Sequence, residues 1–122
     1  MSNSENITQL FNNWNQALQT GDPKQVASLY HPEAVLLPTV SNQVRHNHAE
    51  IEDYFVHFLA KGPQGTLNEQ NIRIFGDLAI NSGVYTFQFN DDSRVQARYT
   101  FVYRRQADGW LIIEHHSSAM PE

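Results

Sequence analysis

Four segments with strand-like composition fill the second half of the chain, and the connections between them leave room only for hairpins. Residues 66–75, 78–89, 94–105 and 110–118 are rich in β-branched and aromatic side chains, which favour strands. Residues 76–77 (GD), 90–93 (NDDS) and 107–109 (ADG), which separate them, are typical turn-formers. Because connections this short require antiparallel neighbours, the pattern predicts a four-stranded antiparallel meander.

A long amphipathic helix is predicted at the start of the chain. Ser2 and Glu5 form a candidate capping box, and apolar residues then recur at helical spacing as far as Leu18. Gly21 ends the run. Trp14 lies on the apolar face of this helix, which predicts an inward position for its side chain.

Two further helices and one short strand are predicted before the meander. A short helix begins at residues 22–23 (DP) and turns Tyr30 inward. Residues 34–38 (AVLLP) form a short strand, with which residues 44–45 are able to pair. Asn47 with Glu50 resembles a second capping box, and the helix that follows carries Tyr54, together with Phe58, on its inner face.

This order of elements predicts an α+β fold with the helices packed on one face of the sheet. The length of 122 residues and a hydrophobic content of 40% are typical of a single globular domain, which we take as residues 1–122.

Composition argues against several classes of partner and cofactor. A net charge of −5 repels phosphate backbones, so we expect no nucleic-acid partner. No apolar run approaches the length of a membrane helix, and the first residues lack the features of a signal peptide, so we expect a cytoplasmic protein without a membrane partner. The chain has no cysteine and no glycine-rich dinucleotide fingerprint, and we expect no cofactor and no metal.

The aromatic residues of the meander predict a pocket. Residues 85, 87 and 89 share one face of their strand, and residues 99, 101 and 103 share one face of the next. A curved sheet wrapped around the long first helix leaves a gap near the helix ends, where aromatic walls would make a mostly apolar pocket.

The chain resembles a known family in its last two strands and in its upstream helices. The stretches "ARYTFVYRRQADGWLIIEHHSSAMP" and "GDLAINSGVYTFQF" are similar to the calcium/calmodulin-dependent protein kinase II association domain, and to small stand-alone bacterial proteins grouped with it (SgcJ/EcaC-type). Both belong to the nuclear transport factor 2-like superfamily, which implies a cone of helices and a curved sheet. The same fold carries enzymes, carriers and assembly modules, so the resemblance implies fold more strongly than function.

The resemblance does not extend to the anion-binding cup of the kinase domain, which is lined with arginines. The matching positions are Tyr85, Phe101 and Ser117, none of which is basic. Arg98 is a candidate substitute, but strand alternation places it on the face opposite Phe101, and the register of the hairpin through residues 90–93 decides its position. A chain of this length has no room for a kinase catalytic domain and contains no catalytic-loop motif.

His115 is the one histidine that strand parity assigns to the pocket, on the same side as Ile113 and Ser117. An imidazole there is able to bind a ligand or to act as a general base. The alternative is a core histidine whose hydrogen bond is satisfied by a neighbouring tyrosine. His115 and His116 point to opposite faces, which argues against a shared metal, and His31, His46 and His48 lie where solvated residues are expected. No carboxylate dyad of the kind used by related isomerases and cyclases is recognisable.

The outer face of the sheet is predicted to be an interface between two copies of the chain. Thr100, Val102, Trp110, Ile112 and Glu114 make that face too apolar for solvent alone, which favours a sheet-to-sheet homodimer with possible higher assembly.

Three functions remain open at this point. The first is a non-catalytic, small-molecule-binding homo-oligomer, and the second is an isomerase, cyclase or hydrolase with His115 as its base. The third is an assembly module without a ligand, in which side chains fill the cone. The predicted ligand-binding residues are Trp14, Tyr54, Tyr85, Arg98, Phe101, His115 and Ser117.

Overall fold

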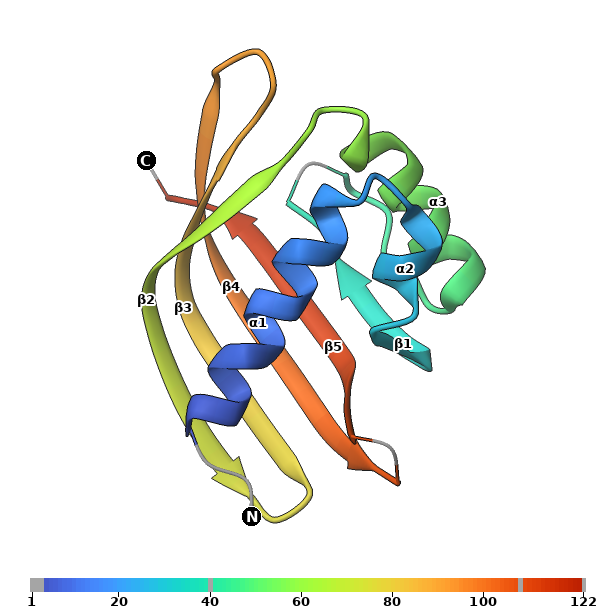
Figure 1. Ribbon diagram of the computed structural model, residues 1–122, viewed down its shortest axis with the longest axis vertical. Helices are drawn as coiled ribbons and strands as arrows, with labels where there is room; N and C mark the ends of the chain where they lie inside the picture. Colours follow the sequence, from blue (N-terminus) through green and yellow to red (C-terminus); the bar gives the residue numbers. More distant parts are fainter. Residues whose placement is uncertain (1–3, 40, 108, 122) are drawn as a thin grey trace.

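The computed structural model describes residues 4–39, 41–107 and 109–121, and it confirms the α+β class (Figure 1). Its elements in chain order are α1 (Ser4–Gln19), α2 (Pro23–Ala27), β1 (Tyr30–Leu37), α3 (His48–Leu59), β2 (Gln64–Phe75), β3 (Leu78–Gln88), β4 (Arg94–Gln106) and β5 (Gly109–Ala119). The meander is present as β2 to β5. Ser2, the predicted cap of α1, and Asp108, in the last predicted turn, lie outside the described residues.

The sheet has five strands rather than the predicted four, in the order β1-β5-β4-β3-β2. β1 joins the edge of the meander parallel to β5, with Leu36 beside His115. β1 starts earlier than predicted, so Tyr30 is the first residue of a strand and not part of the short helix. The predicted pairing of residues 44–45 with this strand is present as a single bridge between Leu36 and Arg45.

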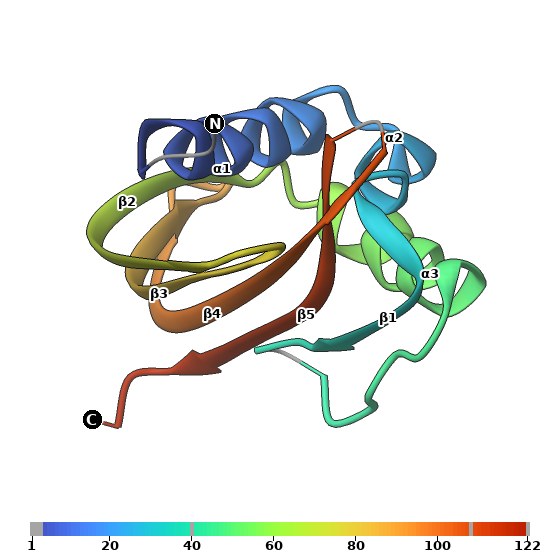
Figure 2. The same ribbon diagram turned by 90° about the horizontal axis from the view of Figure 1, so that it is seen from below.

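All three helices lie on the concave side of the sheet. Figure 2 shows the sheet curving beneath α1, with α3 closing one side of the cone. The predicted cap of α3 is present, because the Asn47 side chain accepts a hydrogen bond from the Glu50 amide at 2.9 Å. The Glu50 carboxylate accepts one in turn from the His46 amide, at 2.8 Å, and not from Asn47 as in a standard capping box.

A β-bulge at Ile113 decides which side chains of β5 face the core. Glu114 pairs with Val102, and Ile112 pairs with the next residue of β4, Tyr103, so Ile113 is left as the extra residue. The bulge reverses the alternation, and as a result Ile112 and His115 are both buried. The prediction that Ile112 lies on the outer face is therefore wrong.

The prediction for Trp110 is also corrected. Its indole packs against the edge of the hydrophobic core and lines a surface groove together with Leu10 and Leu29, on the helix side of the sheet. The guanidinium of Arg105 lies 5.9 Å from the centre of the Trp110 ring.

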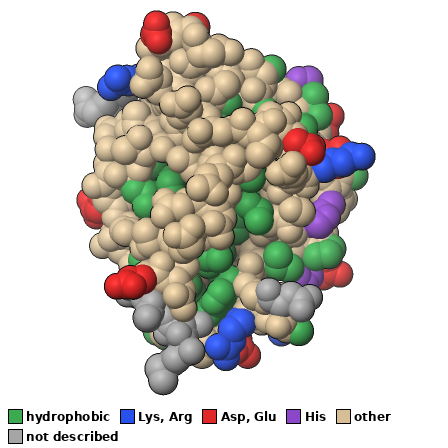
Figure 3. Space-filling view, in the orientation of Figure 1, with side chains coloured by type: hydrophobic (Ala, Val, Ile, Leu, Met, Phe, Trp, Pro, Cys, Tyr) green, Lys and Arg blue, Asp and Glu red, His purple; other side chains and the backbone are tan. Residues whose placement is uncertain are grey.

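None of the helices in the described ranges covers the convex face of the sheet (Figure 2). The strand register places its side chains in rows across β3, β4 and β5: Ile80, Val102 and Glu114; Ser82, Thr100 and His116; Val84, Arg98 and Ser118. Apolar side chains of this face are only half-buried in the single chain. On the opposite side, which carries α1, charged side chains lie mainly around the periphery (Figure 3).

Candidate ligand-binding site

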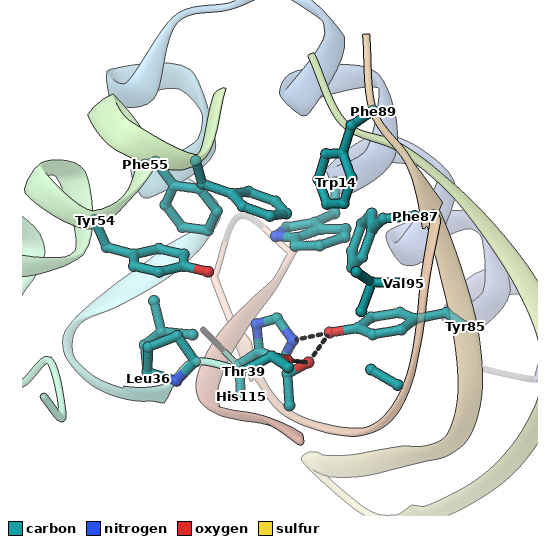
Figure 4. Close-up of a pocket in the computed structure, with 14 residues that line it drawn as sticks. Trp14, Leu36, Thr39, Tyr54, Phe55, Tyr85, Phe87, Phe89, Val95 and His115 are labelled. Carbon is teal, nitrogen blue, oxygen red and sulfur yellow. Dashed lines mark hydrogen bonds between the residues drawn. The ribbon is translucent and has the colours of Figure 1, made fainter. Parts of the chain in front are cut away.

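The candidate site lies inside the cone, where side chains from α1, β1, α3 and the three central strands converge. Trp14 comes from α1, Tyr85 from β3 and Tyr54 from α3, while β5 contributes His115 and Ser117 (Figure 4). The full lining consists of Trp14, Leu36, Pro38, Thr39, Tyr54, Phe55, Phe58, Tyr85, Phe87, Phe89, Val95, Ala97, His115 and Ser117. Among these described lining residues there is no Asp, Glu, Lys or Arg.

The free space in this pocket is small. It measures about 30 Å³, which is room for about two water molecules. Pro38, Thr39, Phe89 and Val95 are half-buried, so the pocket approaches the surface beside these residues. Aromatic side chains fill much of the cone, and a larger occupant requires some of those at the mouth to move.

His115 sits at the centre of the aromatic packing. Its ring stacks on Phe101 with centroids 4.0 Å apart, and the indole of Trp14 meets it edge-on at 5.4 Å. The side chain is 3% exposed. Burial lowers the pKa of His115 to about 3, with a smaller contribution from the neighbouring His116, so the imidazole is neutral at pH 7.

The inner half of a hydrogen-bonded chain links Trp14 to His115. The indole Nε1–H of Trp14 donates to the hydroxyl of Tyr30 across 3.1 Å, and this hydroxyl lies 2.8 Å from Nδ1 of His115. Burial raises the pKa of Tyr30 well above its ordinary value, so the phenol keeps its proton. The Tyr30 hydroxyl therefore has a proton to donate to Nδ1, which leaves the imidazole hydrogen on Nε2.

The outer half of the chain runs from His115 to the mouth of the pocket. Nε2 of His115 lies 3.2 Å from the hydroxyl of Tyr85, which donates to Ser117 Oγ across 2.7 Å. Ser117 Oγ is in turn hydrogen-bonded to Thr39 Oγ1. Figure 4 shows the Tyr85 hydroxyl reaching toward His115 and the Thr39 region. Burial also raises the pKa of Tyr85, so this hydroxyl remains protonated.

Five of the seven predicted ligand-binding residues line the pocket: Trp14, Tyr54, Tyr85, His115 and Ser117. Phe101 is fully buried beneath the His115 ring and supports the wall without lining it. Arg98 is exposed on the convex face, beside Val84 and Ser118, and lies outside the pocket. The sequence left the register of the β3–β4 hairpin, and with it the position of Arg98, undecided. The observed register pairs Arg98 with Val84 and places it on the face opposite the aromatic wall.

Sequence reasoning missed two members of the hydrogen-bonded chain, Tyr30 and Thr39. Both belong to β1 or follow it directly, and they reach β5 only because the two strands are parallel neighbours. The apolar stretch of residues 34–38 gave no sign of its partner strand. No cluster of Asp, Glu, His or Cys residues able to hold a metal ion is present in the described part of the chain.

Two comparisons with known proteins indicate the same family. The model of the calcium/calmodulin dependent protein kinase II association domain matches residues 3–121. A crystal structure from Xanthomonas campestris, named for the same association domain, is 50% identical in sequence, with a TM-score of 0.94. The match covers 100% of this chain and 91% of that one. No curated protein matched the sequence.

More distant structures share the fold. A candidate dehydratase of the nuclear transport factor 2-like family, from Streptomyces avermitilis, has a TM-score of 0.82 at 20% identity, with 97% of this chain and 96% of that chain covered. A candidate aromatic ring hydroxylase from Novosphingobium aromaticivorans has a TM-score of 0.80 at 22% identity, with coverage of 99% and 94%. At these identities the likeness concerns the cone-shaped fold alone.

Proposed function

The chain belongs to the calcium/calmodulin dependent protein kinase II association domain family, and we propose that it is a non-catalytic homo-oligomer that binds a small, largely apolar molecule in its cone. The observation that carries the proposal is the composition of the pocket wall. Aromatic and aliphatic side chains surround a few polar groups, Thr39, Tyr85, His115 and Ser117, which converge on one side. Such a combination is typical of small-molecule sites.

The small free volume sets a condition on this proposal. A ligand larger than a few water molecules enters only if side chains at the mouth, such as Phe89 and Val95, move outward. We therefore expect binding to be accompanied by a change at the mouth, while the Trp14 side of the pocket stays fixed by its packing.

Tryptophan fluorescence provides the test. The chain contains two tryptophans, of which Trp14 lines the pocket and Trp110 does not. In a Trp110→Phe background, the emission reports on Trp14 alone. Titration with a panel of small aromatic compounds is expected to give a saturable change in this emission for part of the panel.

A pocket-blocking variant and a matched control make the test specific. Val95→Phe adds volume at the mouth and is expected to abolish the saturable change. Gln96→Phe adds the same side chain to the exposed, opposite side of the strand and is expected to preserve it. A panel without any saturable change, or equal changes in both variants, would favour a filled cone that serves assembly only.

The oligomeric part of the proposal rests on the family and on the convex face. Val102 and Ile80 are paired across β4 and β3 in the middle of that face, half-buried and without a covering helix. A second copy packed against the sheet would remove them from water.

The alternative of an enzyme with His115 as general base receives less support. A base near pH 7 needs a pKa close to that value, and burial keeps the pKa of His115 at about 3. Both ring nitrogens are occupied, Nδ1 by the hydroxyl of Tyr30 and Nε2 by that of Tyr85. No carboxylate among the described pocket residues is available to orient or charge the ring.

A further inference from the structure

We propose that the pocket selects uncharged ligands that carry a hydrogen-bond acceptor, such as a carbonyl oxygen. This acceptor receives the last proton of the series of side-chain hydrogen bonds that links Trp14 to Thr39. This inference rests on the proposed function and narrows its ligand class. It follows from the direction of the hydrogen bonds, from the polar atoms left at the mouth and from the uncharged pocket wall.

The direction of the chain is set at its inner end. The indole nitrogen of Trp14 is only a donor, so the Tyr30 hydroxyl must accept there. Donation from Tyr30 to His115 Nδ1 then uses the tyrosine proton. The opposite arrangement, with a hydrogen on Nδ1, would leave the Tyr30 proton without an acceptor at a side chain that is 0% exposed. Buried donors without partners are costly, so the first arrangement is favoured.

The same direction continues to the mouth. With its hydrogen on Nε2, His115 donates to the Tyr85 hydroxyl, and Tyr85 donates to Ser117. In the bond between Ser117 and Thr39, one hydroxyl donates and the other keeps its proton. Whichever of the two donates, one O–H at this end of the pocket is left without an acceptor among the described residues.

The unpaired O–H lies where a ligand in the pocket is able to accept its hydrogen bond. Ser117 is 7% exposed, and Thr39, which is half-buried, lies beside the mouth of the pocket. Both side chains line the cavity next to apolar surface, including Ala97 and Leu36. A ligand whose apolar part fills the aromatic side of the pocket brings its acceptor to this hydroxyl pair.

The absence of charged side chains from the described pocket wall argues against two other classes of ligand. A carboxylate would also accept the proton, but the described lining contains no cation to offset its burial. An ammonium group brings further hydrogen-bond donors to a place that already has one donor in excess, and the described lining residues include no carboxylate to accept from them. A neutral ketone, ester or amide satisfies the hydroxyl without a buried charge.

Four probes of similar shape test this inference in the Trp110→Phe background: acetophenone, ethylbenzene, benzoate and 1-phenylethylamine. Acetophenone is expected to bind about tenfold more tightly than ethylbenzene, which lacks only the acceptor. Benzoate and 1-phenylethylamine are expected to bind more weakly than acetophenone. The carbonyl stretching band of bound acetophenone is expected at a lower frequency than in a hydrocarbon solvent.

A variant assigns the donor. Thr39→Val combined with Ser117→Ala removes both hydroxyls at the mouth and leaves the Tyr85 hydroxyl, which has lost its acceptor, as the terminal donor. The carbonyl band of bound acetophenone is therefore expected to move from its position in the parent protein, while the affinity of ethylbenzene stays unchanged. Thr86→Val, on the convex face, is the control and is expected to leave both affinities as they are.

The outcomes separate the two proposals. If none of the probes binds and a wider panel also fails, the proposed function is wrong. If acetophenone and ethylbenzene bind equally, or the amine binds best, the pocket binds ligands but this inference is overturned. A carbonyl band of bound acetophenone that stays at the same frequency after loss of both hydroxyls would also overturn it, because the donor would then lie elsewhere.

Discussion

The Nδ1 atom of His115 lies 2.8 Å from the hydroxyl of Tyr30, and this contact joins β5 to the neighbouring strand β1 inside the core. It gives the imidazole a fixed tautomer, because Tyr30 accepts from Trp14 and so must donate to the histidine. The imidazole that strand parity offers as a candidate base is therefore neutral, with its hydrogen on Nε2, where it forms part of the pocket wall.

The first prediction concerns the protonation of His115. We expect its ring to remain neutral, with the hydrogen on Nε2, from pH 5 to pH 8, because burial holds its pKa at about 3. Nitrogen chemical shifts of the imidazole, measured by NMR across this range, check the prediction. A midpoint between pH 6 and pH 7 would contradict it and would reopen the case for acid–base catalysis.

The same shift predicts how stability depends on pH. In the unfolded chain the histidine has a pKa of about 6.5, so between this value and about 3 the unfolded state binds a proton that the folded state does not. The contribution is complete above pH 6.5 and is lost as the pH falls, by at most about 1.4 kcal/mol per pH unit. The free energy of unfolding, measured with urea at pH 5, 6 and 7, is expected to change less with pH for His115→Gln than for the control His57→Gln, whose side chain is exposed.

Removal of the hydroxyl group is expected to affect the free energy of unfolding differently at Tyr30 and at Tyr103. Tyr30→Phe leaves both Trp14 Nε1 and His115 Nδ1 without their partner, and is expected to lower the free energy of unfolding by about 1–3 kcal/mol. The Tyr103 hydroxyl is buried with no partner among the described residues, so Tyr103→Phe is expected to be neutral or stabilising. Urea denaturation of the two variants checks this, and an equal loss in both would contradict the hydrogen-bonded chain.

Gly83 is expected to tolerate no side chain. β2 bulges between Leu67 and Glu69, and this brings the Glu69 carbonyl oxygen to 2.1 Å from the place that a Cβ on Gly83 would occupy. Gly83→Ala therefore requires the backbone to shift, with an expected cost of about 1–3 kcal/mol. Ser82→Ala, at the preceding position, is the control and is expected to have a small effect. Thermal unfolding of both proteins distinguishes them.

The meander and the helix positions were predictable because they depend on local sequence. The turns around Gly76 and the alternation of Tyr85 with its neighbours specify adjacent antiparallel strands without reference to the rest of the chain. The inward positions of Trp14 and Tyr54 follow in the same way from helical periodicity.

The other parts of the site depend on non-local contacts. An apolar strand of a few residues carries no mark of its partner, so the parallel pairing of β1 with β5, and with it the roles of Tyr30 and Thr39, was not predictable. The bulge at Ile113 has no clear signature either, and simple alternation consequently placed Ile112 on the wrong face. His115 was nevertheless assigned correctly to the interior, because it and Ser117 both lie on the same side of the bulge.

Self-association through the convex face is the last prediction. None of the helices in the described part of the chain has the length and apolar character needed to cross a bilayer. Sedimentation velocity measures the state of assembly. Val102→Glu places a charge in the centre of the face and is expected to shift the protein toward the monomer. Gln106→Glu, at the end of β4, adds the same charge and is expected to leave the assembly intact. Monomers in both the parent protein and the control would contradict the oligomer, whereas an unchanged assembly of Val102→Glu would place the interface elsewhere on the surface.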